Sequence, residues 1–258
     1  MSQKTSFRTL KVVCALTWLN LMLPCHSQAV TCETTPSLIP ITMGYHGMKV
    51  TIKGESAPGD QVIVKITSAP ADAHLKYKGK AAGIFWMKLG TLIFKNIPGT
   101  YLVSTSAPVD TILSPAERDQ NSIGYEALQK KAEITAEHGE LPAGDWFTEF
   151  LEFKQQEKIY ALTEGNVQVD QNGGYTLALD WPYQAQPATY TVEAITSRDG
   201  RVTGRAESSV KVEMTGMVAT ISDMATNRRA LYGAIAIVVA LAVGFAVGNI
   251  FKKGGGAH

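Results

Sequence analysis

A long uncharged run near the carboxyl end constrains the fold of this chain most strongly. The 22 residues from Ala230 to Phe251 carry no charge, a pair of arginines precedes them and a pair of lysines follows. About 20 apolar residues suffice for a helix to span a bilayer, where a helix satisfies its own backbone hydrogen bonds. We therefore predict a transmembrane anchor with basic flanks over residues 228–253 and a tail over 254–258. A buried helix of a soluble fold is the alternative.

Small residues recur along this expected helix at every fourth position. Ala236, Ala240, Gly244 and Gly248 would form one ridge, along which a second helix backbone can approach closely. The ridge predicts packing against an integral-membrane partner or a second copy of the chain. Glycine and alanine are common in spanning helices of every kind, so the pattern alone leaves a passive tether open.

The amino terminus predicts export. Three basic residues precede an apolar run from Val12 to Leu23, and Ser27-Gln28-Ala29 offers a small-residue cleavage site, which is the layout of a secretory signal peptide over residues 1–29. An uncleaved first anchor is the alternative, although the run is short for a span. Export would stop at the carboxyl-terminal helix and leave Lys252 and Lys253 in the cytoplasm. We expect a single-pass protein with an exported amino-terminal domain and a cytoplasmic carboxyl terminus.

The charge of the expected exported part argues against a nucleic-acid partner. The signal holds three basic residues and the helix flanks hold four, which leaves 17 basic and 23 acidic residues over 30–227, a net charge of −6. Nucleic-acid binding requires a basic surface instead. Cys14 and Cys25 fall within the expected signal, so Cys32 would have no intramolecular disulfide partner. We expect Cys32 to lie in a loose amino-terminal tail, with a cross-link between two chains as the alternative.

The residues between signal and anchor predict a mainly β fold. The stretch "MKVTIKGESAPGDQVIVKITSAP" alternates around a turn in the first β segment (30–108), and "ATYTVEAITSRDGRVTGRAESSVKVEM" predicts a hairpin turning at Asp199-Gly200 in the second (165–227). Between them, residues 109–164 have the composition of an acidic helical insertion. We predict an immunoglobulin-like β-sandwich with this insertion, and one sandwich or two small β domains both fit the pattern.

Aromatic residues in the expected insertion recur at helical spacing. Within "DWFTEFLEFKQQEKIYAL", Trp146, Phe150 and Phe153 would share one helix face, with Glu149 and Glu152 on the opposite face. We expect the aromatic stripe to pack into the core, with a membrane-surface or partner-binding face as the alternative.

Several stretches resemble a known family. "AGIFWMKLGTLIFKNIPGTYLVSTSAPVDTI", "ATYTVEAITSRDGRV" and "ALYGAIAIVVALAVGFAVGNIFKK" are similar to segments of an uncharacterised transmembrane protein family first described from alphaproteobacteria. The resemblance covers about Leu38 to Lys253, less closely in "KKAEITAEHGELPAGDW". It implies a bacterial inner-membrane protein with a periplasmic domain. Family genes often lie beside a permease of the sulfite or organosulfonate exporter type, which implies an accessory role, and the family carries no established catalytic residues.

No motif in the sequence predicts a reaction. His46, His74, His138 and His258 are scattered, without the spacing of a metal site. The sequence holds no nucleophile elbow and no phosphate-binding glycine loop after a strand. We therefore expect no enzyme activity, no catalytic residue, no cofactor and no metal site.

The strand "HLKYKGK" is the strongest candidate for a binding surface. In extended backbone, His74, Lys76, Lys78 and Lys80 project to one side while Leu75 and Tyr77 project to the other. Such a row could hold sulfite, a sulfonate or a lipid phosphate. Protection of an edge strand, or complementation of the protein's own acidic helices, are the alternatives. Nearby, Phe85 and Trp86 alternate, so one of them is expected to pack inward.

Two functions fit these patterns. The first is a non-enzymatic accessory subunit of an inner-membrane transporter, which the helix ridge would engage. The second is an independent anchored module that binds an anion or an envelope component through Lys76, Lys78 and Lys80.

Overall fold

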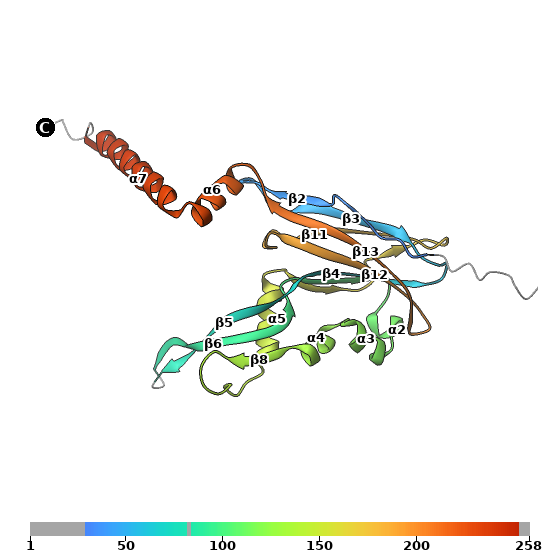
Figure 1. The fold of residues 1–258 in the computed structure, drawn as a ribbon. Coiled ribbons are helices and arrows are strands. Elements are labelled where there is room, and N and C mark those ends of the chain that lie inside the picture. The colour runs from blue at the N-terminus through green and yellow to red at the C-terminus, as the bar shows by residue number, and fades with distance from the viewer. Residues whose placement is uncertain (1–28, 82–83, 253–258) are drawn as a thin grey trace, which may run out of the picture.

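The computed structural model describes residues 29–81 and 84–252 (Figure 1). Within these residues the chain is mainly β, with a layer of short helices and a long helix at the carboxyl end, which confirms the expected fold class. Most of the expected signal peptide, over residues 1–28, and the tail over 254–258 lie outside the described residues. The immunoglobulin-like strand arrangement stays a prediction.

Two sheets pack face to face. Sheet A has the strand order β1-β3-β11-β10, and sheet B the order β2-β13-β12-β4-β7-β9. Their bounds are β1 (Glu33–Thr35), β2 (Leu38–Ile41), β3 (Met48–Glu55), β4 (Gln61–Ser68), β7 (Tyr101–Thr105), β9 (Tyr160–Thr163), β10 (Gln168–Val169), β11 (Gly174–Trp181), β12 (Ala188–Arg198) and β13 (Arg201–Met214). Ile52 and Leu177 of sheet A meet Val64 and Val192 of sheet B in one buried core. The two sheets therefore form a sandwich.

The two β segments of the sequence are interleaved within this sandwich. Strand β3 of the first segment pairs with β11 of the second, and β4 pairs with β12. One sandwich, rather than two small β domains, is what the chain forms. The turn between β12 and β13 is where the sequence predicts it, with Asp199 and Gly200 both at positive φ, as a two-residue hairpin turn requires.

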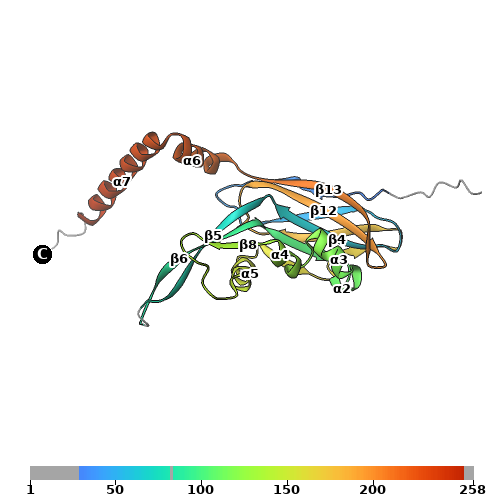
Figure 2. The same cartoon turned by 60° about the horizontal axis from the view of Figure 1, so that its bottom comes forward.

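A helical layer covers the other face of sheet B (Figures 1 and 2). Its elements are α2 (Val109–Ile112), α3 (Pro115–Asn121), α4 (Tyr125–Lys131) and α5 (Trp146–Gln156), together with a third sheet of order β5-β6-β8 built from β5 (Pro70–Ala81), β6 (Phe85–Pro98) and β8 (Glu133–Ala136). Ile63 and Ile195 of sheet B meet Phe94 and Phe150 of this layer in a second core. Ser114 caps the start of helix α3, and its hydroxyl accepts a hydrogen bond from the Glu117 amide, which is the N-cap arrangement.

Several local expectations differ from the structure. Phe150 is buried, but Phe153 is 40 % exposed and Phe147 is buried in its place, because the covered face of α5 lies nearer position 147 than the stripe predicts. Glu149 and Glu152 are exposed as expected. The stretches "GIFWMK" and "TLIFKNIPG" belong to the single strand β6.

Cys32 does not lie in a loose tail. The Thr31 amide donates to the Glu55 carbonyl oxygen, and the Tyr175 hydroxyl donates to the Thr31 carbonyl oxygen. These bonds hold the segment against sheet A, and the Cys32 side chain packs at the edge of the first core. Burial there raises the pKa of the thiol above its ordinary value, partly offset by hydrogen bonding with Tyr175.

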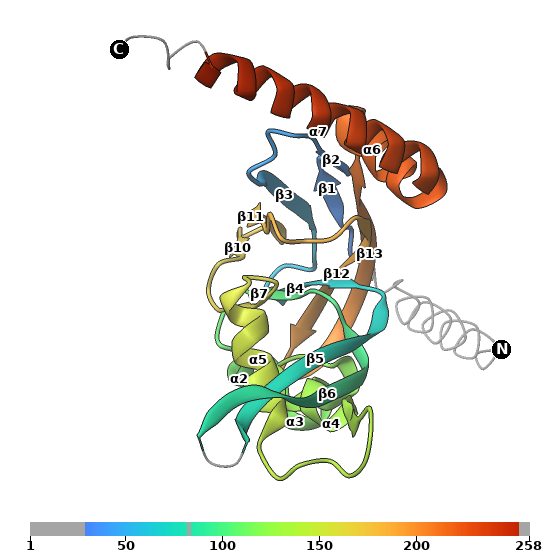
Figure 3. The same cartoon turned by 90° about the vertical axis from the view of Figure 1, so that its left-hand side faces the viewer.

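The carboxyl end is helical from residue 216 onward. Helix α6 (Gly216–Asn227) occupies what the sequence assigns to the second β segment, which therefore ends at Met214. Helix α7 (Arg229–Lys252) follows directly and extends away from the sandwich (Figures 1 and 3).

Candidate functional site

Helix α7 has the length and composition of a membrane span. Residues Arg229–Asn249 have a mean hydropathy of 2.5, and none of this stretch is buried in the structure. The ridge of Ala236, Ala240, Gly244 and Gly248 is exposed, and a Cβ added at Gly244 or Gly248 would meet no atom of the described residues within 4 Å outside the backbone of α7 itself. The ridge is therefore free to receive another helix. The side chains of Ile250, Phe251 and Lys252 and all of Lys253 lie outside what the structure describes.

The lysine row lies on the β5–β6 hairpin. His74, Lys76 and Lys78 are exposed, whereas Leu75 and Tyr77 on the other side pack against the second core. The alternation predicted from the sequence is thus present along these residues. Lys80 is paired with Trp86 in the ladder, but neither side chain lies among those that the structure describes.

Strand β6 adds to this row, since Lys88 is exposed and directly opposite Lys78. Among the described residues, Lys76, Lys78 and Lys88 take part in no salt bridge, while Lys95 farther along β6 pairs with Glu133 at 3.3 Å. No salt bridge among the described residues therefore joins these lysines to the acidic helices. Glu137 is a neighbouring acid, and its pKa is lowered chiefly by hydrogen bonding with Thr91, with smaller electrostatic contributions from His138, Lys88 and His74.

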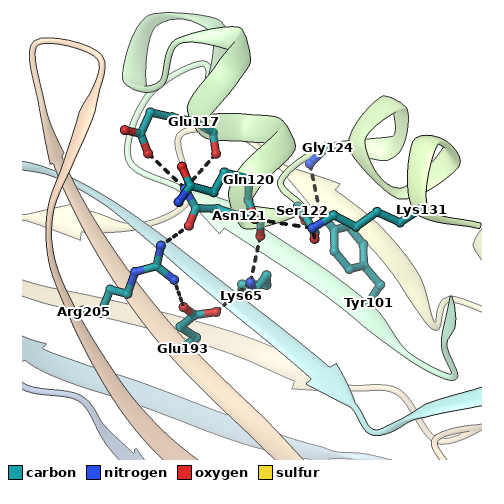
Figure 4. Close-up of polar contacts among 10 residues, drawn as sticks. All are labelled: Lys65, Tyr101, Glu117, Gln120, Asn121, Ser122, Gly124, Lys131, Glu193 and Arg205. Atoms are coloured by element: carbon teal, nitrogen blue, oxygen red, sulfur yellow. Dashed lines mark hydrogen bonds and ion pairs between the residues drawn. The ribbon is translucent and has the colours of Figure 1, made fainter. Parts of the chain in front are cut away.

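A second polar cluster joins sheet B to the helical layer, and the sequence did not predict it. Figure 4 shows Glu193 of β12 between Lys65 of β4 and Arg205 of β13. The Glu193 carboxylate lies 2.6 Å from the Lys65 Nζ and 2.9 Å from the Arg205 Nη1. Lys65 also donates to the Asn121 carbonyl oxygen at 3.0 Å, and Arg205 donates to the Asn121 side-chain oxygen. The charges thus hold the end of α3 against the sheet.

Tyr101 completes this attachment (Figure 4). Its hydroxyl donates to the Ser122 carbonyl oxygen and accepts from the Gly124 amide, both at 2.9 Å. Burial of the ring raises the pKa of this hydroxyl well above its ordinary range. The hydroxyl therefore stays protonated and bridges the turn between α3 and α4. We interpret the whole cluster as a structural clamp, because both Glu193 oxygens are engaged by cations of the protein itself.

The helical layer also carries a hollow of about 270 Å³ bordered by α2, α3 and α4. Its cations are paired within the layer, Arg118 with Asp110 and Lys130 with Asp119. Within the described residues, no three histidine, cysteine or acidic side chains gather as metal ligands do.

A signal for the Glu193 cluster was present in the sequence. Lys65 interrupts "VIVKIT" and Glu193 interrupts "TVEAIT", and an isolated charge in an apolar strand is rarely buried unless it is paired. Pairing the two required the β4–β12 register, in which Lys65 is directly opposite Glu193. The sequence could not supply that register.

Fold and helix together define the class of the molecule, which is a membrane protein whose described residues hold a β-sandwich domain followed by one helix of spanning length, α7. The chain belongs to the family described as "Putative transmembrane protein (Alph_Pro_TM)", which matches residues 29–253. The comparison with curated proteins finds no match.

Proposed function

We propose that this protein is a non-enzymatic accessory subunit of an inner-membrane transporter, anchored by α7 with its β domain in the periplasm. The observation that carries the proposal is the uncovered ridge of α7, where a Cβ added at Gly244 or Gly248 would contact no other element that the structure describes. In lipid, helices associate through small residues that let backbones approach closely. A helix with this ridge is suited to pack against a spanning helix of a partner or of a second copy.

The transporter class rests on the family. The chain resembles proteins whose genes often lie beside permeases of the sulfite or organosulfonate exporter type, and this resemblance supports a partner of that type. The layout of residues 1–29 and the lysines after α7 support a periplasmic domain and a cytoplasmic carboxyl terminus. A fluorescent protein fused after His258 should fold and fluoresce, and alkaline phosphatase at the same place should be inactive. The reverse pattern would place the domain in the cytoplasm.

Crosslinking in native membranes tests the docking role. Full-length protein should yield an integral-membrane partner by mass spectrometry, and Gly244→Leu with Gly248→Leu should lose it because leucine side chains keep the helices apart. The matched control is Ala242→Leu with Ala246→Leu, which places two leucines on the other side of α7. Equal recovery with both double variants, or recovery of monomer alone, would show that α7 is only a tether.

An independent anion- or envelope-binding module is the second candidate. The row of His74, Lys76 and Lys78 favours it, because these side chains are exposed and form no salt bridge among the residues that the structure describes. Sulfite, sulfate and short sulfonates would be titrated calorimetrically. Replacing Lys76, Lys78 and Lys80 with glutamine should abolish the heat while circular dichroism stays native. Lys211→Gln is the control, since Lys211 pairs with Glu213 on β13. Unchanged binding by the triple variant would remove this candidate.

A further inference from the structure

The core-facing side of the β5–β6 hairpin continues beyond the helices that cover it. Tyr77 lies on this side and contacts Trp146 of α5, with ring centroids 5.4 Å apart. Farther out, Phe85, Met87 and Leu89 are 70 %, 51 % and 50 % exposed. Met87 is opposite Gly79, and a Cβ built on Gly79 would meet the Leu89 side chain. Met87 and Leu89 therefore lie on the same face of the hairpin. The hairpin ends in an apolar stripe that the described part of the chain does not cover.

The opposite face of the same ribbon is cationic. Lys78 and Lys88 are directly opposed, and Lys76 and His74 continue the row toward the body. Like charges that face each other across a ladder destabilise a sheet, and an anion placed over them would offset that repulsion. The distal hairpin thus joins an apolar face to a basic face within a few residues.

The hairpin and the anchor extend from the same end of the molecule. Figures 1 and 2 show the hairpin tip leaving the sandwich toward the end from which α6 and α7 emerge. The turn between β10 and β11 lies at the other end (Figure 1). Because α7 is the membrane anchor, this end of the β domain faces the bilayer.

We propose that the distal hairpin is a second membrane contact. Phe85, Met87 and Leu89, with Ile84 at the turn, enter the interfacial region, while Lys76, Lys78 and Lys88 contact anionic lipid headgroups. Basic residues beside a membrane are attracted to anionic lipid, and aromatic and aliphatic side chains partition into the interface. The insertion is shallow, because a two-stranded ribbon has open edges that hydrocarbon cannot satisfy. The proposal rests on the anchor alone and not on a transporter partner.

The bilayer fits this surface better than a second copy of the chain. Two hairpins meeting through their apolar faces would each still leave a row of unpaired lysines in water, and a face-to-face contact of the basic sides would oppose like charges. An anionic bilayer that the ribbon enters by its tip contacts the apolar face and the basic face together, and the anchor keeps the bilayer permanently within reach of the hairpin.

Photocrosslinking of the full chain tests the contact. Benzoylphenylalanine is placed at Phe85 or Met87, with Gln171 in the exposed β10–β11 turn as the control position. The protein is reconstituted alone into vesicles of phosphatidylcholine with about one third phosphatidylglycerol. Lipid adducts at Phe85 and Met87 should exceed those at Gln171 by at least about fivefold. Equal adducts at the three positions, or a crosslinked dimer in their place, would overturn the proposal.

A separate variant tests whether the lysines contact the anionic headgroups. Replacing Lys76, Lys78 and Lys88 with glutamine should lower the Phe85 adduct several-fold in the anionic vesicles and leave it unchanged in pure phosphatidylcholine. These side chains are exposed, so the fold should be preserved. Lys95→Gln with Lys211→Gln removes two lysines that already have acidic partners and should change nothing. Equal loss in both lipids would mean that headgroup charge plays no part.

Discussion

At Glu193, a carboxylate with a side chain only 11 % exposed faces two cations. Glu193→Gln leaves Lys65, whose side chain is 13 % exposed, without its counter-charge. We expect a loss of about 3 kcal/mol in the free energy of unfolding, because breaking a buried pair strands the remaining charge. Chemical denaturation of the full chain in detergent measures it.

The control is the exposed Lys211–Glu213 pair, whose side chains are 61 % and 36 % exposed. Glu213→Gln should cost under about 1 kcal/mol. Similar losses at both positions would contradict the clamp that attaches α3 to sheet B.

Cys32 offers a second test at a single residue. Burial raises the pKa of its thiol, so little thiolate exists at pH 7, and the thiolate is the form that reacts. Iodoacetamide should label Cys32 at least about tenfold more slowly in the folded protein than in urea, followed by peptide mass spectrometry. The rate should rise with pH toward the raised pKa. Because the folded state favours the protonated thiol, this group contributes stability to the fold. That contribution is fully present below the ordinary thiol pKa and is lost as the pH rises through the raised pKa. Equally fast labelling in both states would indicate a loose segment.

Sequence reasoning located exposed residues better than buried charges. Alternation alone placed Lys76 and Lys78 on an open face, because strand geometry has a strict period of two. It failed for Phe153, because the face of α5 that is covered depends on how that helix sits against β6. It also missed Glu193, since the partner of a buried charge is set by strand register.

Among the elements, the β10–β11 turn packs against the segment that follows β3. Gly173 has φ +93, and an added Cβ would lie 2.1 Å from the Ser56 carbonyl oxygen. Gly173→Ala should therefore cost about 2–4 kcal/mol through strain and the lost Ser56 contacts. Gly165 has φ +71 with open space around it, so Gly165→Ala should cost only about 1 kcal/mol. Thermal unfolding of the two variants compares them, and equal costs would show that the close approach to Ser56 is unimportant.

Element types were largely predictable, and their ends were not. The hairpin at Asp199-Gly200 has a turn signal that acts locally, so its position was predictable. Helix α6 was missed because the end of strand β13 is set by its partner strand. Met214, the last residue of β13, pairs with Ile41, the last residue of β2. Strand β12 alternates poorly in sequence because both of its faces are buried, one under sheet A and one under the helices.

For the whole molecule, the interleaved β segments make one body, and the β5–β6 hairpin and α7 leave it at the same end (Figure 2). The anchor was predictable from 22 uncharged residues alone. The apolar end of the hairpin was not, because Phe85, Met87 and Leu89 are exposed only where the covering helices stop. The proposed arrangement places the domain beside a membrane partner while α7 packs against that partner.

Export by living cells tests the proposed function most directly. Cells that lack this chain should release sulfite or a sulfonate more slowly than parental cells. The native chain and the Ala242→Leu, Ala246→Leu variant should restore export, and the Gly244→Leu, Gly248→Leu variant should not, at equal protein levels in the membrane. Unchanged export without the chain, or equal rescue by both double variants, would contradict an accessory subunit that docks through α7.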